Sequence, residues 1–285
     1  MQREPVVAGM FYPAEPGRCA AEVAGFLEDA RRAVPQDGFF AGLVPHAGWT
    51  YSGPIAARTF ATLAASGTPS TLVIFGAVHT WGVQRPSLFA RGSWRTPLGV
   101  LGVDETLASE ILQQADGRIV DNPQAHSQEH SIEVQLPFVK YLFPEARIVP
   151  LMVPPVEGSV AVGEAVGRAV QPRGQDVFLL GSSDLTHYGP RYGFTPRGTG
   201  LAALAWAKEN DRRLLDAALQ MRAKDVVAQA ATDYSACGAG AIAATVAAAG
   251  ALGARRGILL EQTTSHDVHP VGTPTDFVGY AAVVF

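Results

Sequence analysis

Short apolar runs alternate with longer segments of helical periodicity along most of the chain. A continuous apolar run of strand length is typical of a strand that is buried on both faces of a sheet. We expect strands over residues 39–44, 71–75, 147–153, 177–180, 257–264 and 278–285. We expect helices over residues 53–65, 105–114, 131–143, 159–170, 201–218, 223–231 and 237–249. This alternation predicts an α/β fold in which helices cover both faces of a central sheet.

Local signals at the ends of these segments refine the prediction. Asp104 can accept hydrogen bonds from exposed backbone amides, and we expect it to cap the helix that runs to Gln114. Pro137 lies inside segment 131–143 and predicts a kink or a break there. No helical segment separates the last two strands, so we expect a mixed sheet. No repeat, linker or composition break divides the chain, and we expect residues 1–285 to form a single domain.

Composition excludes several classes of protein. Hydrophobic residues make up 47% of the chain and charged residues 17%, which excludes a disordered chain and indicates a large buried fraction. The net charge of −4 lacks the basic character of a nucleic-acid-binding protein, and no polybasic arm indicates a membrane surface. Segment 236–254 is uncharged but consists mostly of Ala and Gly, which favours a closely packed internal helix over a membrane span. With two cysteines and no signal peptide, we expect a cytoplasmic protein with free thiols.

Three of the expected strands end close to a histidine. His46 follows strand 39–44 and His79 follows strand 71–75. Asp184 and His187 both follow strand 177–180. Because ligands of open α/β sheets bind outside the carboxyl ends of the strands, this pattern predicts a functional site at one edge of the sheet.

The residue types at this edge allow two kinds of chemistry. Neutral imidazole binds Fe, Zn, Cu and Ni, and it also transfers protons near neutral pH. Cys237 lies where a loop passes into a helix, and a helix N-terminus favours the thiolate that binds metals. The residues leave two other roles open for Cys237: a small buried core residue, or a nucleophile with His187 as its base.

Two further histidine pairs need separate interpretations. His126, Glu129 and His130 form an H-x-x-E-H pattern, which is found in zinc peptidases. Ser127 or Ser131 could cap a helix that starts within this pattern, and no third ligand stands out, so a peptidase is the less favoured alternative. The H-x-x-H pattern over residues 266–269 falls between the last two strands, and we interpret it as a polar surface turn.

The chain resembles the MEMO1 family, and in particular its bacterial and archaeal branch, which is also called AmmeMemoRadiSam system protein B. The likeness runs almost from end to end and rests on motifs in a fixed order. These motifs occupy residues 3–5, 8–13, 45–49, 51–53, 96–99, 129–137, 182–188, 236–238 and 278–280.

The resemblance implies a fold similar to that of class III (LigB-type) extradiol dioxygenases. It implies that His46 and His79 bind a metal ion and that Cys237 is the third ligand, where the dioxygenases have a carboxylate. His187 is then placed as an acid/base and Asp184 as its neighbour in the pocket. His130 is expected to line the same cleft. One departure is that Ala77 and Val78 precede His79, where the family usually has a polar neighbour able to support the histidine.

These implications define the expected function. We expect a metal-dependent oxidoreductase or dioxygenase that uses Fe(II) on an unknown small molecule, with Cu or Zn as the alternative metals. A ligand set of two histidines and a cysteine is softer than the facial triad of iron oxygenases, which is why Cu and Zn are retained. The family name also implies work beside AMMECR1-type and radical-SAM proteins. The alternative is a non-catalytic protein that binds metal, a ligand or a peptide in the same cleft, because fold similarity alone does not transfer an activity.

Overall fold

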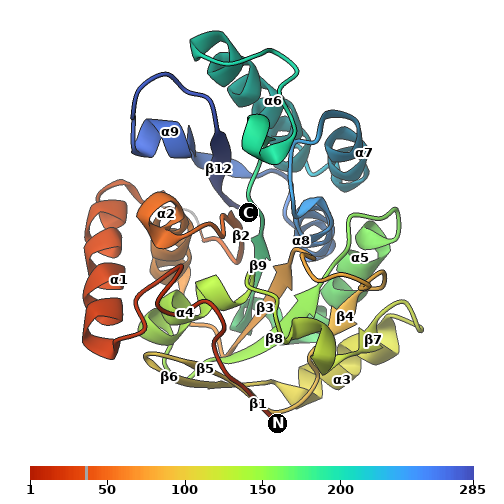
Figure 1. Cartoon of the computed structure of the whole chain (residues 1–285). Helices are drawn as coiled ribbons and strands as arrows, with labels where there is room; N and C mark the ends of the chain where they lie inside the picture. The colour runs from red at the N-terminus through yellow and green to blue at the C-terminus, as the bar shows by residue number, and fades with distance from the viewer. Residues whose placement is uncertain (36–37) are drawn as a thin grey trace.

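The structure is a computed structural model that describes residues 1–35 and 38–285. A mixed sheet lies between two layers of helices (Figure 1). Its centre is parallel, in the order β2-β9-β3-β8, and antiparallel strands join it on both sides. The strands of the sheet are β2 (Ala41–Val44), β3 (Thr71–Gly76), β4 (Ser87–Leu88), β7 (Val120–Asp121), β8 (Arg147–Met152), β9 (Val177–Ser182), β10 (His187–Tyr188), β11 (Ile258–Thr264) and β12 (Phe277–Val284). The predicted α/β class, the mixed sheet and the helices on both faces are confirmed.

Helices from distant parts of the chain form the two outer layers. The helices are α1 (Pro16–Ala30), α2 (Trp49–Ser66), α3 (Glu105–Gln114), α4 (Leu136–Leu142), α5 (Ser159–Val170), α6 (Leu201–Leu219), α7 (Ala223–Asp233), α8 (Ala239–Ala251) and α9 (Ser265–Val268). In Figure 1, α1 and α2 lie on one side of the sheet, and α5 and α8 lie on the other. A small separate sheet contains β1 (Gln2–Arg3), β5 (Ser93–Thr96) and β6 (Gly99–Gly102). None of the helices in the described residues is long and apolar enough to cross a membrane.

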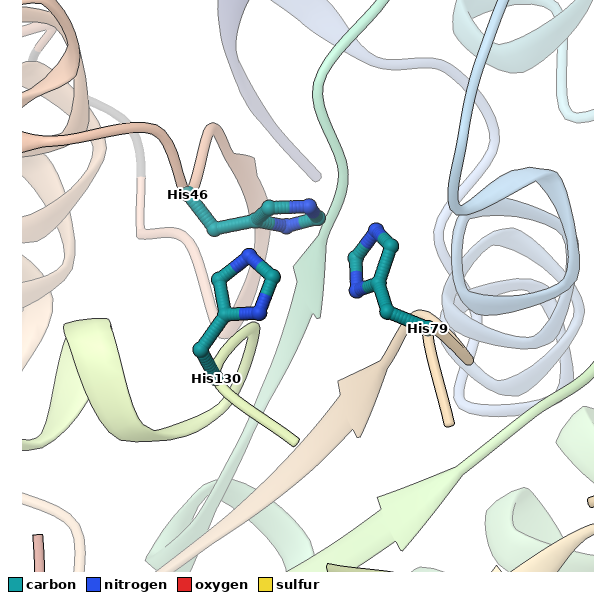
Figure 2. A group of neighbouring side chains, drawn as sticks. All are labelled: His46, His79 and His130. Carbon is teal, nitrogen blue, oxygen red and sulfur yellow. The ribbon is translucent and has the colours of Figure 1, made fainter. Parts of the chain in front are cut away.

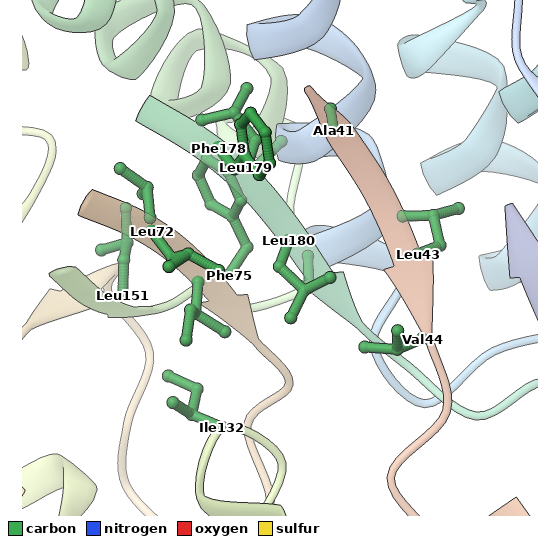
Figure 3. Packing of buried hydrophobic residues seen from close by; sticks show 14 of the residues in the cluster. Ala41, Leu43, Val44, Leu72, Phe75, Ile132, Leu151, Phe178, Leu179 and Leu180 are labelled. Atoms are coloured by element: carbon green, nitrogen blue, oxygen red, sulfur yellow. The ribbon is translucent and has the colours of Figure 1, made fainter. Parts of the chain in front are cut away.

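The central strands are apolar throughout because helices cover both of their faces. Leu72 and Phe75 of β3 and Leu179 and Leu180 of β9 have no exposed surface, and Figure 3 shows them packed beside their neighbours from adjacent strands. Each fully buried side chain of this size contributes about 1.5–3 kcal/mol to folding. The packing of these buried strands fixes the positions of their carboxyl ends and of the residues that follow them.

The uncharged segment 236–254 contains the internal helix α8, as predicted. Its small residues allow α5 to approach so closely that a Cβ added at Gly163 would lie 2.2 Å from the carbonyl oxygen of Ala244. Helix α8 starts at Ala239, two residues later than predicted, because the backbone N–H of Cys237 donates to the carbonyl of Asp184. Cys237 therefore lies in the loop before the helix.

The structure differs from the prediction in segment 131–143 and at helix α1, and agrees with it at the start of α3. Segment 131–143 is not one helix with a kink: a turn and a 3₁₀ segment precede α4, and Pro137 lies in the first turn of α4. A proline costs nothing there because the first amides of a helix have no intrahelical acceptor. Asp104 caps α3 as predicted, accepting from the backbone N–H of Leu107. Helix α1 was missed, although its buried positions Cys19, Val23 and Leu27 repeat every four residues.

Candidate metal centre

Strands β2, β9 and β3 are parallel neighbours, so the residues after their carboxyl ends meet at one edge of the sheet. His46 follows β2, Asp184 follows β9 and His79 follows β3. The rings of His46 and His79 lie with their centroids 5.2 Å apart. The sequence-based expectation that these strands bring their polar residues together is therefore met.

Three histidines form the centre of this site. One nitrogen from each of His46, His79 and His130 lies within 4.8 Å of the others. Figure 2 shows the three rings converging from three separate segments of the chain. His130 was expected only to line the cleft, and the structure makes it a candidate ligand because its ring stacks on that of His79, with centroids 4.6 Å apart.

His46 is held so that the lone pair of one ring nitrogen faces the site. The hydroxyl of Ser182 donates to the carbonyl of Ser131 at 2.7 Å, so its oxygen can only accept from Nδ1 of His46 at 3.1 Å. That arrangement leaves the lone pair on Nε2, the nitrogen that faces the site. Burial, together with the charges of the other histidines, holds the pKa of His46 well below its usual range. A neutral imidazole is the form that binds metal ions.

His79 is oriented by a buried carboxylate from another segment. Glu129, whose side chain has no exposed surface, accepts from Nδ1 of His79 at 3.0 Å and from its backbone N–H at 2.6 Å. The same carboxylate accepts from the backbone N–H groups of His130 and Ser131. Burial opposes ionisation of Glu129, but these hydrogen bonds outweigh it and hold its pKa below its ordinary value. A carboxylate that fixes the tautomer of a histidine in this way is typical of metal sites.

Glu129 supplies the polar support that the sequence lacks just before His79. The residues just before His79 provide no polar support, but Glu129 provides it from 50 residues further along the chain. Burial lowers the pKa of His79, but the hydrogen bond and charge of Glu129 outweigh burial, and the net shift is upward. The sequence contained the signal, because Glu129 belongs to the H-x-x-E-H pattern, but its partner could not be read from the spacing.

The peptidase interpretation of that pattern does not hold. Glu129 and His130 face the site, whereas His126 is fully buried elsewhere. Nε2 of His126 lies 2.9 Å from the carbonyl of Ser87, and its ring packs against Trp94. The pattern spans a 3₁₀ turn and a loop rather than one helix, so its two histidines do not share a face.

The N-terminal segment holds the loop that carries Glu129 and His130. The guanidinium of Arg3 is buried and donates to the carbonyls of His126 and Glu129 at 2.7 and 2.6 Å. It also pairs with the carboxylate of Glu133 at 2.7 Å and lies over the ring of Trp94. The Arg3-Glu4-Pro5 motif therefore has a structural role, which is to anchor the loop of the site.

Cys237 lies beside the histidines. Its Sγ is 3.3 Å from Nε2 of His46 and 3.6 Å from the carbonyl of Asp184. Burial, followed by the charge of Asp184, raises the pKa of the Cys237 thiol, which is opposite in direction to the lowering expected from a helix N-terminus. Its role as third metal ligand stays a prediction.

Asp184 and His187 do not contact each other through a hydrogen bond. Asp184 accepts from the backbone N–H of His46 at 2.7 Å, and Nδ1 of His187 lies 3.0 Å from the carbonyl of Leu185. Burial raises the pKa of Asp184, and the nearby His187 opposes this shift. Asp184 therefore positions the first candidate ligand, while the backbone of Leu185 orients His187.

A cavity of about 530 Å³, called the metal cavity below, opens over the three histidines. Asp184, His187 and Arg191 line it as well. So do His266 and His269, which the sequence placed on a polar surface turn. The capping box of α9 and the return of the chain into β12 bring these two histidines to the rim. No local pattern could have shown this, because it depends on how β11 and β12 pair.

Comparison with known proteins identifies the family of the chain. The family model described as Memo-like protein matches residues 3–284. A MEMO1 family protein of Pyrococcus abyssi is 38% identical, covering 100% of this chain and 99% of the relative. MEMO1 family proteins of Methanopyrus kandleri and Methanosarcina acetivorans are each 36% identical, covering 100% and 99% of this chain and 99% and 98% of those relatives. The chain belongs to the MEMO1 family of Memo-like proteins.

Proposed function

We propose that the protein is a metal-dependent oxidoreductase that acts on a small molecule in the metal cavity. His46, His79 and His130 hold the metal ion, and Cys237 is an additional donor beside His46. The observation that carries the proposal is the cluster of three imidazoles, two of which have Nδ1 paired so that Nε2 carries the lone pair that can bind. Such outer hydrogen bonds orient the ligands of established metal sites.

Fe(II) is the metal that we propose, with Cu and Zn as alternatives. Imidazole suits all three metals, and a thiolate at Cys237 would increase the preference for Cu or Zn. Bound Fe(II) would supply one-electron redox chemistry with O₂ as the oxidant. The cavity of about 530 Å³ falls within the usual range for small-molecule sites.

The other residues of the cavity either act on the substrate or hold a metal ligand in place. Nε2 of His187 is free to take or return a substrate proton, because Nδ1 is engaged with the carbonyl of Leu185. Asp184 holds the backbone of His46 and so keeps the first donor in place. Arg191, on the wall of the cavity, supplies a positive charge for an anionic group of the substrate.

One observation favours a second candidate function, which is a non-catalytic protein that binds metal or a ligand. The close approach of Cys237 to His46 forms a soft donor pair, and such a pair suits storage or transfer of Cu(I). The two functions differ in whether the bound metal consumes O₂. Association with AMMECR1-type and radical-SAM proteins stays a proposal from the family resemblance, tested by co-purification.

The test is elemental analysis of protein purified without oxygen or chelator, as wild type and as His46→Ala, His79→Ala, His130→Ala and Cys237→Ala. His269→Ala is the matched control, because this histidine lies at the rim of the same cavity. We expect near-stoichiometric iron in the wild type and the control, and loss of iron in the three histidine variants. O₂ consumption by the iron-loaded protein supports the oxidoreductase, and stoichiometric metal without O₂ consumption supports the binding protein. Absence of metal from all forms refutes the oxidoreductase and leaves a protein that binds a ligand without metal.

A further inference from the structure

A second cavity lies beside Cys237 and His187. It has a volume of about 380 Å³ and is called the apolar cavity below. Tyr192, Phe194 and Tyr234 form its aromatic walls, and alanines of α7 and α8 form much of the rest. No Asp, Glu, Lys or Arg of the described chain lines it. The metal cavity, in contrast, contains Asp184 and Arg191.

The two cavities are neighbours that share two lining residues. His187 and Tyr192 line both, and their rings contact edge to face with centroids 5.1 Å apart. Cys237 lines the apolar cavity, and its Sγ lies 3.3 Å from Nε2 of His46 in the metal cavity. A molecule that occupies both cavities therefore passes directly beside the candidate ligands.

Tyr234 is an unusual residue at its position. It follows the last residue of α7 with a φ of +52°, a left-handed conformation that favours Gly or Asn at the end of a helix. Its side chain is 69% exposed, so burial does not compensate the strain. Its ring lies 5.4 Å from that of Phe194 and so extends the aromatic wall. Strained residues that gain nothing from burial are often found at functional sites.

We propose that the apolar cavity binds an uncharged aromatic group of the same substrate whose polar part lies in the metal cavity. Aromatic walls favour aromatic occupants through edge-to-face and offset-stacked contacts. A charged group would lose its hydration there without gaining a partner. The inference rests on the proposed function, and it adds the substrate class: a molecule with a polar head and an uncharged aromatic group.

The first experiment measures binding of 2-naphthol to the full-length, metal-free protein by ligand-observed NMR. We expect saturable binding of one molecule, and binding at least tenfold weaker for 2-naphthalenesulfonate. Ala231→Leu fills the cavity from an exposed position on α7, and Tyr234→Ala removes a wall. Each variant is expected to bind 2-naphthol at least fivefold more weakly than the wild type. Ala228→Leu is the control, since it makes the same change on the exposed surface of the same helix, outside the apolar cavity.

Thermal melting confirms that each variant folds. Equal binding of 2-naphthol to wild type and to both cavity variants overturns the proposal. Binding of 2-naphthalenesulfonate to the wild type as tightly as 2-naphthol also overturns it. A second measurement loads the protein with Co(II) and follows relaxation of the 2-naphthol protons. Enhanced relaxation supports an aromatic site beside the metal centre, and unchanged relaxation with Co(II) and 2-naphthol both bound overturns it. Failure to bind Co(II) at all contradicts the proposed function, while the metal-free titration still decides whether the aromatic site exists.

Discussion

Glu129→Gln is the most informative single change in this protein. The substitution keeps the size of the side chain but replaces one of two oxygens, both of which only accept hydrogen bonds, with a donor. With the amide nitrogen in the place of Oε2, it faces the backbone N–H of His79, which lies 2.6 Å from that oxygen. With the nitrogen in the place of Oε1, it faces the backbone N–H groups of His130 and Ser131.

Either orientation places donor against donor at a side chain that has no exposed surface. An unpaired buried amide costs about 1–3 kcal/mol. In the second orientation the amide also donates to Nδ1 of His79, which moves the ring proton to Nε2 and removes the lone pair that binds metal. Loss of such an orienting partner typically lowers metal affinity about 10- to 100-fold. That range corresponds to about 1.4–2.8 kcal/mol of binding free energy.

The assay is competition for Zn(II) or Co(II) between the protein and a chelator of known affinity. Glu133→Gln is the matched control: the same substitution of a buried carboxylate on the same loop, which pairs with Arg3 rather than with a histidine. We expect Glu129→Gln to lower the metal affinity about 10- to 100-fold. We expect Glu133→Gln to lower the stability of the protein, with a smaller loss of metal affinity. Equal affinity of Glu129→Gln and wild type would refute the argument that this carboxylate sets the tautomer of His79.

Three other changes test the structure outside the metal ligands. Arg3→Met leaves the Glu133 carboxylate buried without its cation, and we expect a loss of about 3–5 kcal/mol in urea unfolding; a loss below 1 kcal/mol would contradict the anchoring role. Burial lowers the pKa of His126 to about 4 in the folded state. Between that value and the unfolded pKa of about 6.5 the unfolded chain binds more protons, so stability falls with falling pH. His126 accounts for about 2 kcal/mol of the loss from pH 7 to pH 5, and His126→Gln should reduce the difference between those pH values by that amount; an unchanged difference would contradict the assignment. Gly163→Ala places a methyl group 2.2 Å from the Ala244 carbonyl, and we expect overpacking to cost about 1–3 kcal/mol by thermal or urea unfolding; an unchanged midpoint would show that α5 and α8 can separate without cost.

Some elements of this fold could be predicted from nearby residues in the sequence, and others could not. Helix α5 has the predicted bounds, and Asp104 caps α3 as predicted, because periodicity and capping depend on residues within a few positions. The short strands β4 and β7 were not predicted, since two-residue strands have no pattern of their own. Pro137 was expected to kink or break segment 131–143, and the α-helix starts at Leu136, after a 3₁₀ segment, with Pro137 in its first turn.

Some features of the site could likewise be predicted from the sequence, and others could not. His46, His79 and His187 were identified from the sequence because each follows a buried strand, and the carboxyl ends of parallel strands share an edge. The support of His79 by Glu129 was not predictable, because the two residues lie 50 positions apart and meet only through the packing of the loop.

The sequence by itself determined the fold class, the family and the edge of the sheet where the site lies. These properties follow from apolar periodicity and from ordered motifs, which are local and survive in the unfolded chain. Only the tertiary structure decided that His130 joins the histidine cluster, that His126 does not, and that an apolar cavity adjoins the site. The physical reason is that coordination and cavity shape depend on distances between side chains from different segments, and packing alone sets those distances.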